Sequence, residues 1–157
     1  MDSPSARGAS TLKVWLASGG IPSEAVVIAN GSGLFDANRV TTEALALVLA
    51  RMEARPEVFP EYLTQLSIYG TDGTLRKRML QSGERSRVRA KTGTLSQVDA
   101  LSGYVLRADG LRPLVFSLIV SGASGGHGPV RQALDRAVFG WAKALAGPGE
   151  AKTAPPP

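Results

Sequence analysis

The stretch that decides this fold is Arg89-Ala90-Lys91-Thr92-Gly93-Thr94-Leu95. Read as an extended strand from Val88 on, it places even-numbered residues on one face and odd-numbered residues on the other. The ammonium of Lys91 supplies charge and the hydroxyl of Thr92 a directed donor, which together suit a carboxylate. Gly93 has no side chain, so the backbone of a substrate could come close. The stretch therefore predicts a carboxylate-binding strand at the edge of a sheet.

Composition limits the function classes. The chain has 157 residues, 43% hydrophobic and 20% charged, which suits one soluble globular domain with a sizeable core. The 18 basic and 13 acidic residues give a net charge of +5, which favours anionic partners such as acidic cell-wall polymers, nucleic acid or a membrane surface. With no cysteine and one histidine, His127, a metal cluster or a Ser-His-Asp triad is hard to build, so we expect no metal and no cofactor. We interpret His127 as a solvated loop residue.

The first half of the chain is expected to be mainly helical. Residues 1–8 are predicted to be a flexible lead-in, followed by a helix from Ala9 that Gly19-Gly20 stops. Residues 25–29 form a short strand that ends in the loop at 30–33. A helix capped by Thr41 or Thr42 is closed by Pro56, a second covers about 57–68, and a turn follows at 69–74.

The second half is predicted to be three strands and a helix. After the Lys91 strand come a strand at 97–106, a hairpin turn at 108–110 and a strand at 114–120, which is apolar enough to be covered on both faces. The final helix carries a core stripe of Val130, Leu134, Val138, Trp141 and Leu145. Residues 147–157 are expected to be a disordered tail. The fold class is therefore α+β, an antiparallel sheet with packed helices, in one domain over residues 9–146.

Five short blocks together resemble one enzyme family. They are Asn-Gly-Ser-Gly-Leu at 30–34, Asn-Arg-Val-Thr at 38–41, Tyr-Gly-Thr-Asp-Gly-Thr-Leu at 69–75, Lys-Thr-Gly-Thr-Leu at 91–95 and Ser-Gly-Tyr at 102–104. Their order and spacing over about residues 8–145 resemble the C-terminal part of the D-alanyl-D-alanine carboxypeptidase/endopeptidase family. These are class C low-molecular-mass penicillin-binding proteins, in which Lys-Thr-Gly is a signature element. The resemblance implies the C-terminal part of a penicillin-binding/β-lactamase-like transpeptidase fold.

The resemblance also implies an activity. In the family a serine attacks the bond between two terminal D-alanines of a peptidoglycan peptide, and water hydrolyses the acyl-enzyme. Lys91 would lie beside that serine, Thr92 would bind the carboxylate of the peptide or of a β-lactam, and the backbone N–H of Thr94 would be an oxyanion-hole donor. Gly93 belongs to the same substrate wall, which would pair with the substrate backbone. The full-length family works in the periplasm or cell envelope.

Of two further family motifs, one is present in an unexpected position and the other is absent. The one Ser-x-x-Lys is Ser10 to Lys13, which lies too close to Lys91 in the sequence for the family's nucleophile, so Ser10 and Lys13 are weak candidates. No Ser-x-Asn occurs, because the residues two places before Asn30 and Asn38 are not serines. We therefore expect a C-terminal fragment that is inactive by itself, with the missing N-terminal half as a possible partner.

Two alternatives of other classes stay open. One is a peptidoglycan-binding remnant without catalysis. The other is a nucleic-acid-binding module that uses the basic run from Arg76 to Lys91, although no aromatic residues interleave with these charges. We expect no nucleic-acid partner, no membrane span and, from the acidic and polar start at residues 1–4, no signal peptide. The sequence does not distinguish carboxypeptidase from endopeptidase action.

Overall fold

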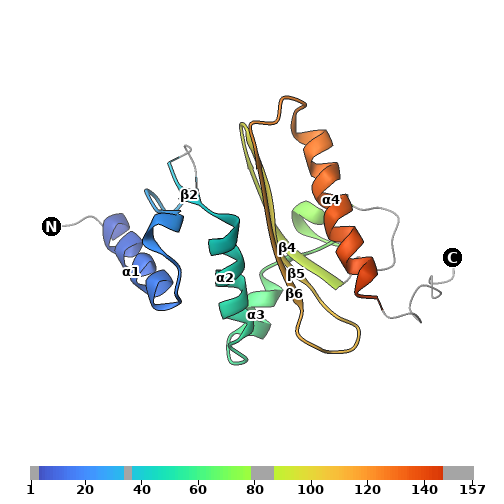
Figure 1. Cartoon of the computed structure of the whole chain (residues 1–157), viewed down its shortest axis with the longest axis horizontal. Coiled ribbons are helices and arrows are strands. Elements are labelled where there is room, and N and C mark those ends of the chain that lie inside the picture. Colours follow the sequence, from blue (N-terminus) through green and yellow to red (C-terminus); the bar gives the residue numbers. More distant parts are fainter. Residues whose placement is uncertain (1–3, 34–36, 79–86, 147–157) are drawn as a thin grey trace.

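A four-stranded antiparallel sheet lies between helices. The computed structural model describes residues 4–33, 37–78 and 87–146. The sheet has the order β3 (Ser67–Ile68), β4 (Val88–Leu95), β5 (Val98–Val105) and β6 (Leu114–Ser121). Helix α2 (Thr42–Glu53) covers one face and α4 (His127–Ala144) the other, while α1 (Pro4–Ser18) lies on the far side of α2 (Figure 1). The predicted α+β class is confirmed.

Strands β4 and β5 form a tight hairpin at the centre of the sheet. Their register runs from Leu95 opposite Val98 at the turn to Val88 opposite Val105 at the far end. Gly103 allows this approach, because a Cβ on it would lie 2.1 Å from the carbonyl oxygen of Arg89. The face toward α4 holds the main core, to which β4, β5 and α4 contribute Val88, Ala90, Leu101, Val105, Leu134, Val138 and Ala142.

The opposite face of the sheet is closed by α2 and by α3 (Phe59–Thr64). Thr41 caps α2 by accepting a hydrogen bond from the backbone N–H of Ala44, as expected for a threonine at this position. The buried hydroxyl of Tyr104 donates to the carbonyl of Leu49 at 2.8 Å, and the ring of Phe59 meets Tyr104 edge-on. These contacts fix α2 against β5.

Helix α1 belongs to a separate small cluster. Leu16, Ile21 and Ala44 form its buried centre. The guanidinium of Arg51 donates to the carbonyl of Trp15 at 2.6 Å and lies 4.3 Å from the centre of its ring, a cation–π contact. A 3-10 turn at Ser23–Ala25 and the two-stranded pair β1 (Val26–Val27) and β2 (Arg39–Val40) complete this part.

Two helix boundaries differ from the prediction. Helix α1 begins at Pro4 and not at Ala9, so the predicted lead-in is helical from residue 4. Proline fits the first turn of a helix because its missing N–H would have no intrahelical partner there. The helix expected over 57–68 covers only Phe59–Thr64, since Ser67–Ile68 instead pairs with β4. The tail predicted at 147–157 lies outside the described residues.

Of two predictions about the core, one is confirmed. The strand expected at 114–120 is covered on both faces, since Phe116, Leu118 and Val120 pack in the main core and Val115 packs against the cluster of Leu49, Leu66 and Tyr104. It is nevertheless the last strand in the described sheet, and along β6 only Phe116 is fully buried. The predicted core position of Trp141 is wrong. Trp141 is 36% exposed and lies beside Phe116, and Ala142 points into the core in its place.

Candidate functional site

The outer edge of β4 is paired along only part of its length. Among the described strands, β3 reaches no further than Ala90. The backbone N–H of Tyr69 donates to the carbonyl of Val88 at 3.1 Å, so Val88 directs its backbone groups away from β5. Because this direction alternates along an antiparallel strand, Thr92 and Thr94 present their backbone groups to the same side. The second half of β4 is thus an edge to which an extended peptide can add.

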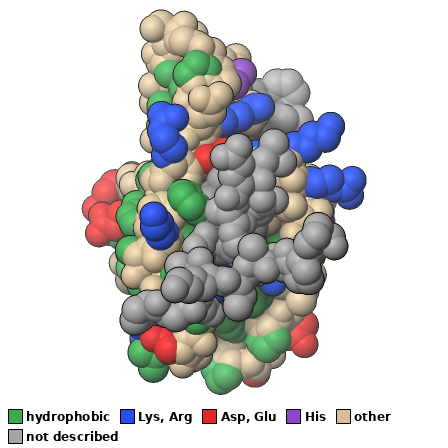
Figure 2. Space-filling model, turned by 90° about the vertical axis from the view of Figure 1, so that its right-hand side faces the viewer, with side chains coloured by type: hydrophobic (Ala, Val, Ile, Leu, Met, Phe, Trp, Pro, Cys, Tyr) green, Lys and Arg blue, Asp and Glu red, His purple; other side chains and the backbone are tan. Residues whose placement is uncertain are grey.

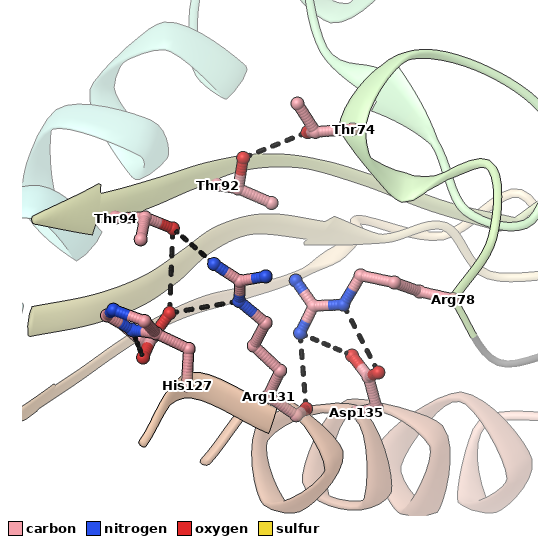
Figure 3. A network of polar contacts seen from close by, with 8 residues as sticks. Thr74, Arg78, Thr92, Thr94, His127, Arg131 and Asp135 are labelled. Atoms are coloured by element: carbon pink, nitrogen blue, oxygen red, sulfur yellow. Dashed lines mark hydrogen bonds and ion pairs between the residues drawn. The ribbon is translucent and has the colours of Figure 1, made fainter. Parts of the chain in front are cut away.

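The predicted carboxylate-binding residues lie together on this edge. Lys91 is exposed, and its Nζ donates to the carbonyl oxygen of Thr92 at 2.6 Å. The hydroxyl of Thr92 lies 2.9 Å from that of Thr74, which belongs to the 3-10 turn η2 (Gly73–Leu75) (Figure 3). A Cβ on Gly93 would meet only the Cβ of Ala100 within 4 Å, at 3.3 Å, so little protein packs against this glycine.

A cavity of about 300 Å³ opens beside the strand. It is lined by the threonines Thr74, Thr92 and Thr94 and by the guanidinium-bearing Arg78 and Arg131, with Asp99 and Leu134 among the other lining residues. Lys and Arg side chains also gather near the histidine on the face seen in Figure 2. Hydroxyl and guanidinium groups donate hydrogen bonds, so the lining suits a small anionic group.

A buried carboxylate organises one wall of this cavity. Asp99 is 5% exposed, and its two oxygens receive the Nδ1 of His127 at 2.6 Å and the Nε of Arg131 at 3.1 Å (Figure 3). Burial by itself would raise the pKa of Asp99, but the hydrogen bonds from His127 and Arg131 outweigh it and lower that pKa. The prediction that His127 is a solvated loop residue is wrong, because it starts α4 and its Nδ1 is hydrogen-bonded to Asp99.

A second carboxylate, that of Asp135, holds Arg78, the other arginine that lines the cavity. Asp135 of α4 receives the guanidinium of Arg78 at 2.7 Å and the hydroxyl of the buried Tyr69. Burial, followed by the hydrogen bond to Asp135, raises the pKa of Tyr69, so this phenol stays protonated. These contacts tie η2 and the turn before it to α4, and they place Arg78 at the cavity.

The sequence reasoning missed Asp99, Arg131 and Asp135 as site residues. One signal was present for Asp99, which stands on the same strand face as the core residue Leu101. A carboxylate on such a face requires charged partners. The sequence could not identify those partners, because the start and the second turn of α4 supply them.

The structure does not bring the nucleophile candidates Ser10 and Lys13 to this site. Ser10 and Lys13 are exposed on α1, which α2 separates from the sheet (Figure 1). The hydroxyl of Ser10 donates to the carbonyl of Ala6 at 3.0 Å within its own helix. A nucleophile in this position is remote from Lys91.

Other chemistry finds little support in the part of the chain that the structure describes. No group of three or more His, Cys, Asp or Glu residues there could hold a metal ion. None of the described helices is both long and apolar enough to cross a bilayer.

In the loop at 30–33, the side chain of Asn30 accepts hydrogen bonds from the backbone N–H groups of Ser32 and Gly33, which is the geometry of a structural turn.

Comparisons with known proteins show which family this chain resembles. Residues 2–145 match the model of the D-Ala-D-Ala carboxypeptidase 3 (S13) family. The D-alanyl-D-alanine carboxypeptidase of Actinomadura sp. (strain R39) is 35% identical over 111 residues, covering 68% of this chain and 20% of the relative. The penicillin-sensitive carboxypeptidase A of Dictyostelium discoideum is 26% identical over 124 residues, covering 76% and 24%.

Solved structures show the same similarity. Penicillin-binding protein 4 (dacB) of Haemophilus influenzae, complexed with a novel β-lactam, superposes with a TM-score of 0.72 at 27% identity, covering 89% of this chain and 33% of that one. The predatory peptidoglycan endopeptidase Bd3459 of Bdellovibrio bacteriovorus shares the fold with a TM-score of 0.66 at 17% identity, covering 94% and 40%. The chain thus spans about a fifth to two fifths of the length of these relatives.

Proposed function

The chain belongs to the D-Ala-D-Ala carboxypeptidase 3 (S13) family, and from this premise we propose that β4 is the substrate-binding wall of a serine-type peptidase. Its substrate would be a peptidoglycan peptide that ends in D-alanyl-D-alanine, or a β-lactam that mimics one. The open second half of β4 carries this proposal, because it offers backbone groups, a hydroxyl and an ammonium within four successive residues.

Each residue of the wall has a role that its position supports. The peptide backbone would add to the edge of β4 as a further antiparallel strand. The hydroxyl of Thr92 would donate to the terminal carboxylate, and Lys91 would keep the local potential positive. The backbone N–H of Thr94, directed away from β5, would stabilise the oxyanion, a contribution of roughly 3–4 kcal/mol where comparable donors have been removed.

The chemistry also needs a nucleophile, and we propose that Ser10 is not that residue. In this scheme a serine attacks the carbonyl carbon between the two D-alanines, its proton passes to the leaving amine, and water releases the acyl group. The position of Ser10 on α1 speaks against this role, and so does the small share of its relatives that the chain spans. The serine would therefore come from sequence outside these 157 residues, and this chain by itself would be inactive.

Labelling of the purified chain with a fluorescent penicillin tests the inactivity. We expect no covalent adduct by gel and mass spectrometry, with the intact Haemophilus protein as the positive control. A stoichiometric adduct on Ser10 that disappears in Ser10→Ala would contradict the proposal and make this chain a complete enzyme. An adduct on any other serine would contradict both the inactivity of the chain and the need for outside sequence, but not the exclusion of Ser10.

The binding role is tested separately by titrating a diacetyl-L-lysyl-D-alanyl-D-alanine peptide into ¹⁵N-labelled protein. We expect amide shifts confined to β4 and η2 that weaken in Thr92→Val. The exposed Thr11 of α1, whose hydroxyl donates within its helix, provides the matched control Thr11→Val. Shifts that are absent, or that are equal in both variants, would refute the substrate wall.

The nucleic-acid alternative has less support. Arg78 is paired with Asp135, and the guanidinium of Arg87 donates to the carbonyls of Ala142 and Leu145. Two of the cations that would contact phosphates are thus occupied within the protein. Arg85 lies outside the described residues.

A further inference from the structure

Arg131 reaches the cavity from the second turn of α4 and joins two polar groups. Its Nε donates to Asp99 Oδ1 at 3.1 Å, and its Nη2 donates to Thr94 Oγ1 at 3.2 Å (Figure 3). Its side chain remains 44% exposed, so part of the guanidinium still faces solvent at the cavity. One side chain thus connects a buried anion to a hydroxyl of the β4 wall.

The direction of these bonds constrains the hydroxyl of Thr94. A guanidinium can only donate, so Thr94 Oγ1 must accept from Arg131 and its own O–H must point elsewhere. That O–H donates to Asp99 Oδ1 at 3.5 Å, at the limit of a hydrogen bond, and the same oxygen also accepts from Arg131. This long hydrogen bond is weak, so an acceptor that enters the cavity can replace Asp99 as the partner of the Thr94 hydroxyl.

The hydrogen-bond donors around the cavity favour an anion as that acceptor. Arg131 and Arg78 both line the cavity, and Thr74 and Thr92 add hydroxyls to it. Asp99 also lines it, and its negative charge is paired with Arg131, as that of Asp135 is paired with Arg78. The preference for an anion therefore rests on the hydroxyl and guanidinium donors of the lining and not on an excess of positive charge. A volume of about 300 Å³ suits the end of a short peptide.

We propose that Arg131 determines specificity for a free C-terminal carboxylate, by directing the hydroxyl of Thr94 toward it and by placing its own guanidinium beside it. This inference rests on the proposed function, since it names the group that the β4 wall selects. Asp99 has a supporting role, because it holds the guanidinium in the orientation that reaches Thr94, and His127 in turn is hydrogen-bonded to Asp99. A lysine could not replace Arg131 fully, since one ammonium lacks the fixed fork of donors that spans both partners.

The test compares two probes that differ only at the carboxylate. Diacetyl-L-lysyl-D-alanyl-D-alanine and its C-terminal amide are titrated into the chain and followed through the amide signals of β4. The variants are Arg131→Gln and, as a matched control, Arg136→Gln, which removes the same charge from an exposed position of the same helix that does not line the cavity. Circular dichroism checks that each variant folds.

We expect the wild-type chain to bind the acid roughly tenfold more tightly than the amide, the ratio that one charge-assisted hydrogen bond can provide. Arg131→Gln should remove this preference by weakening the acid alone, and Arg136→Gln should keep it. A residue that only supports the fold would change the affinity for both probes equally. If Arg131→Gln does not fold, Thr94→Val removes the hydroxyl, keeps the backbone N–H and should abolish the same preference.

The outcomes separate the two proposals. Equal binding of acid and amide by the wild-type chain overturns the role of Arg131 and the carboxylate contact proposed for Thr92, but it leaves the backbone pairing of the peptide with β4 standing. An unchanged preference in a folded Arg131→Gln or, where that variant does not fold, in Thr94→Val overturns the role of Arg131 and leaves the β4 wall standing. If the wild-type chain binds neither probe, the proposed function fails and the role of Arg131 fails with it.

Discussion

Replacing Gly103 with alanine should cost this fold far more than a single methyl group suggests. The added Cβ would lie 2.1 Å from the carbonyl oxygen of Arg89 and 2.7 Å from the Cα of Ala90. Ordinary van der Waals contact begins at 3.4 Å, so the new atom is more than 1 Å too close to the backbone of the neighbouring strand. Since the obstacle is backbone, no side-chain rotation relieves the clash, and β4 and β5 must separate.

The magnitude follows from what this separation disrupts. Overpacking in a core commonly costs about 1–3 kcal/mol, and a clash with backbone lies at or above the upper end of that range. Ala90 is fully buried next to Gly103, and the hairpin carries the edge proposed for substrate binding. We expect Gly103→Ala to lose about 3 kcal/mol or more of unfolding free energy, or roughly 6 °C or more in Tm for a chain of this size.

The assay is urea unfolding followed by circular dichroism, with Gly140→Ala as the matched control. A Cβ on Gly140 meets nothing within 4 Å, and this glycine lies inside α4. Alanine there should stabilise the helix by up to about 1 kcal/mol. If Gly103→Ala unfolds within about 1 kcal/mol of wild type, below the usual cost of overpacking, the close packing of β4 against β5 is not the constraint described here.

Two further predictions concern the helix cap and the buried carboxylate. Thr41→Ala should lose about 1 kcal/mol of unfolding free energy, since it leaves the N–H of Ala44 without its capping acceptor. Thr41→Ser keeps a hydroxyl and should retain most of that stability. Equal losses in both variants, measured by urea unfolding, would contradict the cap. Because hydrogen bonds from His127 and Arg131 lower the pKa of Asp99, its stabilising contribution should be complete above about pH 4, the ordinary range of an aspartate, and disappear as the pH falls through the lowered folded value. Asp99→Asn should therefore flatten unfolding free energy against pH on the acid side, and an unchanged slope would refute the assignment.

Local patterns were enough to predict much of this structure. Alternation along residues 88–95 and the turn at 108–110 predicted the β4–β5–β6 meander, because hairpin pairing depends on neighbouring sequence. For the same reason the sequence predicted a helix cap at Thr41 or Thr42, and the structure shows that Thr41 is the cap. The fold class followed from these elements.

What the sequence did not predict depends on contacts between distant residues. Ser67–Ile68 continues a helical pattern, yet it pairs with β4 about twenty residues later, and that pairing overrides the local preference. The contact of His127 with Asp99 spans 28 positions, and only the packing of α4 on the sheet reveals it. The sequence likewise showed Arg131 only as one basic residue of a predicted helix. Its position beside Thr94 depends on how that helix packs on the sheet.

The division of β4 into a paired half and an open half has a consequence for how its sequence can change. Val88 and Ala90 are fully buried, so substitutions there are limited by packing. Lys91 and Thr94 are exposed, and the fold tolerates many side chains at such positions. A single strand thus separates the residues that maintain the domain from those that we propose select its ligand. Libraries restricted to its second half could therefore change ligand preference while leaving the thermal stability of the domain largely intact.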